Sequence, residues 1–173
     1  MDGRSDSGVD GADATPAGGD SAGVRVPPPL YYVVGFLVGW TINRWIGGPV
    51  VPSDAAPSAR LVPGVLFMVV GVVIGASAVW AVKRAGSNVA PIRPTTALVT
   101  TGPYRWTRNP MYLSLGLFSA GLAVVLNLLW PLILLPFVVW VVRRRVIVRE
   151  EAYLDRVFGR EYRRYRERVP RWL

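Results

Sequence analysis

The sequence predicts an all-α integral membrane protein with about four transmembrane helices, the last two forming a tight hairpin, followed by a cytosolic C-terminal helix. Three observations predict this class. The 173 residues are 51% hydrophobic, with a mean hydropathy of +0.33. The apolar residues form uninterrupted runs rather than an amphipathic pattern. The formal net charge is +9, and the positive side chains collect between and after those runs.

Residues 1–29 are expected to form a disordered acidic tail. They contain five Asp, six Gly and four Pro, and almost no large apolar side chain. Such a composition cannot bury enough apolar surface to offset the entropy lost on ordering. The basic start and the apolar stretch of a signal peptide are both missing. We therefore expect the membrane domain over residues 30–173.

The first two transmembrane helices are expected at about 30–46 and 61–82. No charge occurs between Arg25 and Arg44, and the second run has 22 residues without a charge. At about 1.5 Å per residue, that run can cross a hydrocarbon layer of about 30 Å. Both runs contain a Gly-x-x-x-Gly spacing, at Gly35-x-x-x-Gly39 and Gly71-x-x-x-Gly75. This spacing favours packing of the two helices on each other, unless it arises by chance in a Gly-rich chain.

The third apolar run, residues 109–142, is expected to fold as a hairpin. It has 34 residues without a charge, and a straight helix of that length would measure about 51 Å, too long for one crossing. Asn127 lies near the middle of the run, and Pro131 follows shortly after. We therefore expect helices at about 111–126 and 128–142, each short for a full crossing.

The placement of charge predicts the orientation. Four crossings put residues 1–29, 83–108 and 143–173 on one side, and these segments hold 18 of the 20 Lys and Arg. Such residues concentrate on the cytosolic side of a membrane. We therefore expect both termini and the 83–108 loop in the cytosol, with the cell membrane as the expected location.

The segment 143–169 is helical by pattern. An apolar and aromatic stripe recurs at helical spacing beside a dense Arg face, at Leu154, Phe158, Tyr162 and Tyr165. One interpretation is a helix lying on anionic headgroups. That interpretation leaves Glu150 and Glu151 unexplained. They either pair locally with Arg143–Arg145 and Arg149, or hold a cationic or polyhydroxylated ligand.

The chain has no Cys and no His. This removes disulfides, thiolate nucleophiles, Cys/His zinc sites and imidazole acid–base chemistry, and we expect no metal. The Arg-rich segment follows a membrane hairpin and matches no nucleic-acid-reading module, so we expect no nucleic-acid partner. Any catalysis then rests on carboxylates, Tyr, Arg, amides or a bound cofactor.

Candidate chemistry is concentrated in residues 98–112. Pro110 predicts a helix start, and the positive N-terminal end of that helix favours a carboxylate or another anion. Donors and rings surround this end, at Tyr104, Arg105, Arg108 and Tyr112. Taken singly, these residues also fit snorkelling arginines, an interfacial aromatic belt and a Pro-initiated helix.

Several motifs occur together and in order. They are Ala85-Gly86-Ser87-Asn88, Leu98-Val99-Thr100-Thr101-Gly102-Pro103-Tyr104, Arg108-Asn109-Pro110-Met111-Tyr112, Glu150-Glu151, Phe158-Gly159-x-Glu161-Tyr162-x-x-Tyr165 and Arg168-Val169-Pro170. In these motifs the chain resembles the isoprenylcysteine carboxyl methyltransferase family, whose wider group includes the phospholipid N-methyltransferases. The resemblance covers about residues 85–173.

The resemblance implies a cytosolic pocket for S-adenosyl-L-methionine. The implied cofactor-binding residues are Thr96, Ala97, Leu98, Val99, Tyr104, Asn109, Pro110, Met111, Tyr112, Glu150 and Glu151. The family often has His at the position of Asn109. Asn forms hydrogen bonds without titrating, so a proton-transfer role is excluded there. Which of the two glutamates contacts the cofactor stays open.

The sequence thus predicts a membrane-embedded, S-adenosylmethionine-dependent methyltransferase acting on a carboxylate or amine of a lipid-like or prenylated acceptor. Methyl transfer from a sulfonium needs alignment and an unprotonated nucleophile more than a general base. Arg108, or an Arg of 143–145, would orient an anionic acceptor. The alternatives are an NADPH-dependent membrane reductase of the sterol-reductase type and a non-catalytic protein that binds anionic membrane lipids. The acceptor and the oligomeric state stay open.

Overall fold

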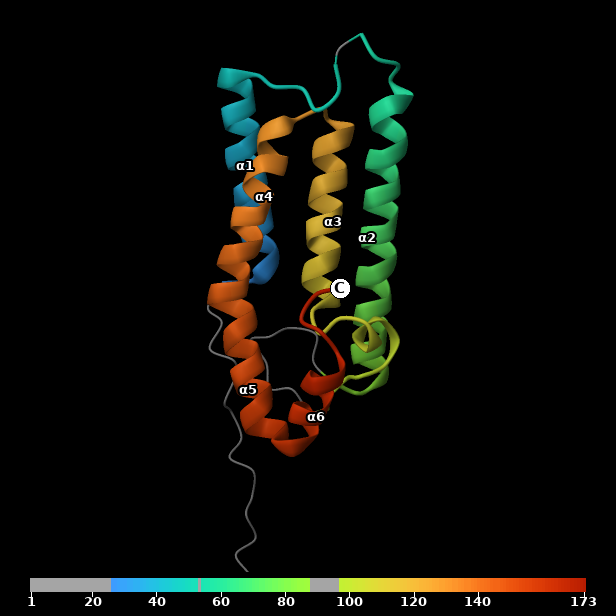
Figure 1. The fold of residues 1–173 in the computed structure, drawn as a ribbon, viewed down its shortest axis with the longest axis vertical. Helices are drawn as coiled ribbons and strands as arrows, with labels where there is room; N and C mark the ends of the chain where they lie inside the picture. The colour runs from blue at the N-terminus through green and yellow to red at the C-terminus, as the bar shows by residue number, and fades with distance from the viewer. Residues whose placement is uncertain (1–25, 53, 88–96) are drawn as a thin grey trace, which may run out of the picture.

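The structure is a computed structural model that describes residues 26–52, 54–87 and 97–173. Every regular element in these ranges is a helix (Figure 1). Four helices stand side by side as a bundle: α1 (Pro28–Ile46), α2 (Ser58–Arg84), α3 (Pro110–Val125) and α4 (Leu129–Val142). The shorter elements are the 3-10 helix η1 (Gly102–Arg105), the π-helical turn η2 (Arg143–Ile147), α5 (Val148–Phe158) and α6 (Arg160–Arg168).

The bundle helices begin and end close to their predicted limits. Pro28 and Pro29 form the first turn of α1, where proline is tolerated, so this helix starts slightly before the predicted range. α2 extends the predicted range at both ends. The rest of the expected tail, residues 1–25, lies outside the described residues, as does the 88–96 part of the following loop.

The last two helices of the bundle form the expected hairpin. Asn127 lies in the turn between α3 and α4, with a φ of 57°, a conformation that Asn tolerates better than most residues. Its Oδ1 accepts a hydrogen bond from the Val51 N–H at 2.8 Å, and its Nδ2 donates to the Val51 carbonyl at 3.0 Å. One residue therefore both bends the chain and ties the hairpin to the α1–α2 connection.

The outer surface of the bundle is apolar. α2, with 27 residues, is among the described helices the one long and apolar enough to cross a membrane by length and composition. α3 and α4 are shorter, with 16 and 14 residues, which agrees with hairpin arms that are short for a full crossing. Large side chains of α2 point outward, with Val62 65% and Leu66 61% exposed. Such a surface is typical of helices that contact lipid.

The pairing of the helices differs from the sequence prediction. α1 packs against α4, and α2 packs against α3 (Figure 1). A Cβ added at Gly39 would lie 2.6 Å from the backbone of Pro131, and one added at Gly71 would lie 2.9 Å from the carbonyl oxygen of Ser114. The prediction that the first two helices pack on each other is wrong, because each directs its glycines at one arm of the hairpin.

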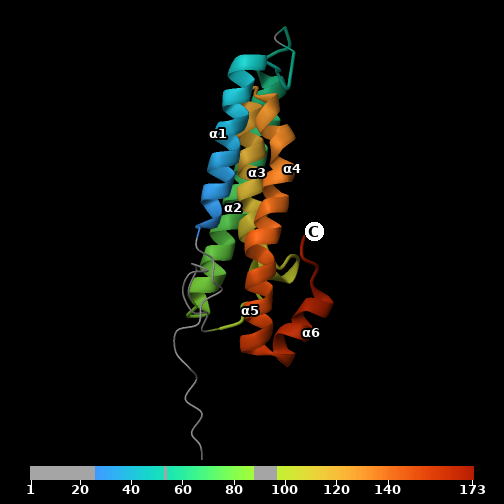
Figure 2. The same ribbon diagram turned by 90° about the vertical axis from the view of Figure 1, so that its left-hand side faces the viewer.

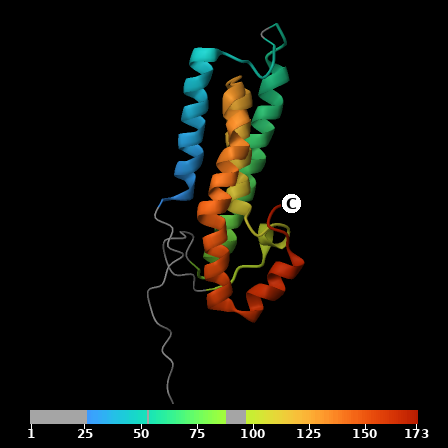
Figure 3. The same cartoon turned by 60° about the vertical axis from the view of Figure 1, so that its left-hand side comes forward.

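The expected single C-terminal helix is two helices. α4, η2 and α5 continue as one long rod (Figure 2), but Gly159, with a φ of 50°, ends α5, and α6 turns back toward the bundle (Figure 3). Tyr162, Tyr165 and Val169 form a buried cluster, and Leu98 packs against it. The aromatic stripe therefore faces the protein, while the Arg side chains of α6 stay exposed, and contact of this helix with anionic headgroups stays a prediction.

Candidate active site

The polar residues expected at the site lie where η1, the start of α3, α5 and α6 come together at one end of the bundle (Figures 1 and 3). α3 starts at Pro110, whose fixed φ suits the first helical position. The first turn contains no acidic side chain, and Asn109 makes no side-chain cap to it. This helix end therefore keeps the partial positive charge that attracts an anion.

Glu150 lies in the first turn of α5. The hydroxyl of Tyr112 donates a hydrogen bond to its Oε2 at 2.7 Å, and no other residue of the described ranges binds this carboxylate. Burial raises the pKa of Glu150 to about 7; the hydrogen bond from Tyr112 lowers this pKa, and the charge of Glu151 raises it. Glu150 is therefore a sheltered carboxylate that titrates near neutral pH and has an oxygen available for a ligand.

Glu151, the next residue, has a different environment. The Nη1 of Arg108 lies 2.9 Å from its Oε1, the Nε of Arg171 donates to the same oxygen at 3.0 Å, and the Nη2 of Arg171 binds Oε2. The side chain of Glu151 is only 12% exposed. We call these three residues the two-arginine clamp. Local pairing with Arg143–Arg145 and Arg149 is wrong, since those arginines are exposed and the partners come from elsewhere.

Residues 169–171 form a strap that lies against the turn before α3. The carbonyl of Arg171 accepts hydrogen bonds from the Oγ1 of Thr107 and the Nδ2 of Asn109, both at 3.0 Å. The backbone N–H of Arg108 donates to the carbonyl of the preceding strap residue, also at 3.0 Å. Thr107 and Asn109 are buried, so these bonds are shielded from water. The strap thus fixes the turn from which α3 begins.

Tyr104 and Tyr112 are both close to Glu150. Burial raises the pKa of Tyr104, and the negative charge of Glu150 raises it further. The hydroxyl of Tyr165 donates to the backbone carbonyl of Tyr104 at 2.8 Å, which ties η1 to α6. Segments far apart in the sequence are thus brought together around one carboxylate.

The guanidinium of Arg108 has one nitrogen with bonding partners and one without. Its Nη1 contacts Glu151 and also donates to the hydroxyl of Tyr162 at 3.4 Å. Its Nε is buried and has no hydrogen-bond partner among the described residues. A buried donor without a partner is unfavourable, so this nitrogen is a candidate contact for an oxygen of a ligand.

The other predicted residues are found in the same region. The half-buried ones are Ala97, Leu98, Val99 and Met111. Asn109 and Pro110 are buried, and Thr96 lies outside the described residues. Sequence reasoning missed Thr107 and Arg171. The signal for Arg171 was present, because it directly follows the Arg168-Val169-Pro170 motif.

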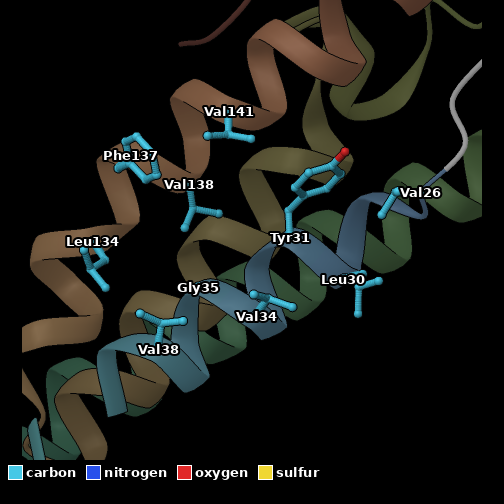
Figure 4. Close-up of a pocket in the computed structure, with 10 residues that line it drawn as sticks. All are labelled: Val26, Leu30, Tyr31, Val34, Gly35, Val38, Leu134, Phe137, Val138 and Val141. Carbon is cyan, nitrogen blue, oxygen red and sulfur yellow. The ribbon is translucent and has the colours of Figure 1, made fainter. Parts of the chain in front are cut away.

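An apolar groove runs between α1 and α4 (Figure 4). Its volume is about 380 Å³. Ten residues line it: Val26, Leu30, Tyr31, Val34, Gly35, Val38, Leu134, Phe137, Val138 and Val141. Beside Tyr31, the hydroxyl of Tyr32 donates to the backbone carbonyl of Tyr112 at 3.0 Å. The helix that forms one wall of the groove is therefore bonded to the residue that holds Glu150.

Comparison with known proteins finds a family match and several relatives. The family described as Phospholipid methyltransferase matches residues 59–161. The protein-S-isoprenylcysteine O-methyltransferase B of Arabidopsis thaliana is 32% identical over 109 residues, which are 62% of this chain and 55% of that protein. The human protein-S-isoprenylcysteine O-methyltransferase is 33% identical over 117 residues, which are 65% of this chain and 40% of that protein.

The Schizosaccharomyces pombe protein-S-isoprenylcysteine O-methyltransferase is 36% identical over 73 residues, which are 42% of this chain and 31% of that protein. The chain thus spans between 31% and 55% of the length of these three relatives. No solved structure matches the chain significantly. The family match covers more than half of the chain and includes the turn before α3, the hairpin and both glutamates. The chain therefore belongs to the phospholipid methyltransferase family, as its motifs indicated.

Proposed function

We propose that the chain is a membrane-embedded methyltransferase that uses S-adenosyl-L-methionine and acts on a carboxylate or amine of a lipid-like or prenylated acceptor. The observation that carries the proposal is Glu150, a sheltered carboxylate with a free oxygen, held by Tyr112 from the first turn of α3. Membership of the family and the names of the relatives support the reaction class.

The residues present fit the proposed cofactor. S-adenosylmethionine has a cationic amine, hydroxyl groups and a carboxylate, and when bound it supplies an electrophilic methyl group. Glu150 suits an amine or a hydroxyl, because its carboxylate accepts hydrogen bonds. The unpaired Nε of Arg108 and the positive end of α3 suit a carboxylate. The rest of the predicted set, including Thr96 and Val99, would surround the cofactor.

The groove between α1 and α4 suits the apolar chain of the acceptor. Its lining is hydrocarbon except for the hydroxyl of Tyr31. An acyl or prenyl chain in the groove would exchange its contacts with lipid for contacts with an equally apolar protein wall. The polar end of the acceptor would then reach toward Glu150. A carboxylate acceptor is ionised at neutral pH, which suits a chain without His or Cys. The exposed Arg143–Arg145, which follow α4, or the Nε of Arg108 would orient such an anion.

The membrane arrangement belongs to the same proposal. We propose that α1 to α4 cross or enter the cell membrane, with the termini and the site in the cytosol. The exposed apolar faces of the bundle support the insertion, and the concentration of Lys and Arg at the site end supports the orientation.

The decisive test is ligand-dependent stabilisation of the purified full chain in mild detergent. We expect S-adenosylmethionine and S-adenosylhomocysteine to raise the Tm. At 100 times its Kd, each ligand should add about 2.7 kcal/mol to the free energy of unfolding. Transfer of a labelled methyl group to a farnesylated cysteine analogue or to a lipid amine then identifies the acceptor class.

The same assay separates the rival functions. Stabilisation by NADPH alone would favour a membrane reductase. No shift with any of these ligands, together with salt-sensitive binding to anionic vesicles, would favour a non-catalytic lipid-binding protein.

A further inference from the structure

Arg171 connects two parts of the candidate site through independent groups. Its guanidinium binds both oxygens of Glu151 on α5. Its backbone carbonyl accepts hydrogen bonds from Thr107 and Asn109, in the turn before α3. The side chain is 27% exposed, so the contact with Glu151 is largely sheltered from solvent. No sequence motif had assigned a role to this residue.

The two adjacent glutamates compete for positive partners. Both lie in the first turn of α5, and the charge of Glu151 disfavours ionisation of Glu150. Both arginines of the clamp bind Glu151, whereas Glu150 faces Tyr112 from α3 and Tyr104 from η1. A buried carboxylate left without its partners is strongly unfavourable. The clamp therefore neutralises one glutamate and leaves the other available.

The strap also sets the geometry around Glu150. It binds the turn that contains Thr107 and Asn109, and α3 begins directly after that turn. Tyr112 lies in the first turn of α3 and holds the Glu150 carboxylate. A displacement of the strap would therefore move the start of α3 and, with it, the hydroxyl that orients Glu150.

We infer that Arg171 is a positioning residue of the site: it neutralises Glu151 and fixes the turn before α3, so that Glu150 alone is presented to the cationic or hydroxyl groups of the cofactor. This inference rests on the proposed function, because it concerns how the same site binds its cofactor. Arg171 acts through Glu151 and through the turn and does not itself touch the cofactor.

The test compares three variants of the full chain by calorimetric binding of S-adenosylhomocysteine between pH 5.5 and 8.5. For Arg171→Gln we expect at least about tenfold weaker binding. We also expect its pH dependence to move to higher pH, because a less neutralised Glu151 makes Glu150 harder to ionise. The double variant Glu151→Gln, Arg171→Gln removes one negative and one positive charge, so the clamp keeps its wild-type net charge, and most of the affinity and the original pH dependence should return.

Arg163→Gln is the matched control. Arg163 also pairs with a carboxylate, Asp155, at 2.9 Å, but its side chain is 59% exposed and the pair lies outside the clamp. We expect wild-type binding from this variant. Arg171→Lys retains the charge and loses the two-point contact, so we expect intermediate affinity with an unchanged pH dependence. The Tm without ligand identifies the variants that fold. If Arg171→Gln does not fold, the binding of Arg171→Lys tests the inference instead.

Each outcome decides between the claims. Wild-type affinity and pH dependence in Arg171→Gln would overturn the positioning role while leaving the proposed function intact. A double variant no better than Arg171→Gln would show that neutralising Glu151 is not what Arg171 does. If the unmodified chain binds no S-adenosylhomocysteine while folded, the proposed function fails and this inference fails with it.

Discussion

The bundle of α1 to α4 and the polar end of the molecule are held together by different forces. In the bundle, glycines such as Gly39 and Gly71 bring helix backbones into close contact, so packing supplies the attraction. At the polar end, a buried carboxylate meets two arginines, and the strap hydrogen-bonds the turn before α3. A lost packing contact reduces stability, whereas a lost polar partner leaves a charge or a donor unpaired. Variants in the first region should therefore change folding, and variants in the second should change ligand affinity.

The largest effect is expected from Glu150→Gln, which breaks the polar end alone. The amide cannot attract a cationic group, so we expect the affinity for S-adenosylhomocysteine to fall about 100-fold or more. At pH 5 the Tm without ligand should stay close to wild type, since burial keeps Glu150 largely protonated in the folded protein there. Glu161→Gln, at an exposed position of α6, is the control and should bind normally. Equal binding by Glu150→Gln and wild type would contradict the assignment of Glu150.

Gly71→Ala tests the other side of the comparison. The added Cβ would meet the carbonyl oxygen of Ser114 at 2.9 Å, so α2 and α3 must separate, at about 1–3 kcal/mol of stability. Thermal unfolding in detergent measures the loss, and the folded fraction should keep its cofactor affinity. Gly116→Ala is the control, because its new Cβ would lie 3.9 Å from the ring of Tyr32, an ordinary contact. A loss of cofactor affinity in Gly71→Ala without a loss of stability would contradict the idea that the bundle governs folding and the polar end governs binding.

The groove is the place where the bundle itself should affect function. Val34→Trp would fill part of the space between α1 and α4, so we expect the KM for a long-chain acceptor to rise about tenfold with an unchanged cofactor affinity. Val73→Trp, at an exposed position of α2, is the control. The effect should shrink as the acceptor chain is shortened. If the KM does not depend on the length of the acceptor chain in either Val34→Trp or Val73→Trp, the acceptor does not bind in the groove.

The smallest effect is expected from Tyr112→Phe, worth about 0.5–1.5 kcal/mol for one hydrogen bond. This bond lowers the pKa of Glu150, so its removal should raise that pKa above about 7 and move cofactor binding to higher pH. The free energy of unfolding should also depend on the pKa of Glu150. Because folding raises this pKa from its ordinary 4.5, the contribution of Glu150 to stability is present at low pH and lost as pH rises through about 7. Tm measurements from pH 5 to 8 should show this loss in wild type and not in Glu150→Gln.

The sequence predicted the bundle well because its signals are local. Uncharged runs set the helix lengths, and Asn127 marked the hairpin turn to within a residue or two. Gly159, in contrast, lies inside a helical pattern, and the pattern alone did not distinguish a continuous helix from a break there. Gly159 divides the stripe between Phe158 and Tyr162, so α6 folds back and its tyrosines face inward rather than outward.

The pairing within the site was beyond the reach of sequence patterns. Tyr104, Tyr112 and the two glutamates were identified from their motifs, and the structure brings them together. Their partners were not identified, because Glu151 binds Arg171, which is 20 positions away, and Tyr112 binds Glu150 across 38 positions. Such contacts depend on how α5 and α6 fold back on α3, and helical periodicity carries no information on that.

The π-helical turn η2 sets the rotational phase of everything that follows it. A π turn contains one residue more than an α-helical turn needs, so η2 rotates α5 relative to α4 without interrupting the rod. If Arg143–Ile147 formed a regular α-helix without losing a residue, Glu150 would turn away from Tyr112 by about 100°. The same rotation would move Glu151 out of reach of its arginines. In a family member with one residue fewer here, a regular α-helix would keep the two glutamates facing the site, whereas a regular α-helix of the full length would turn them away.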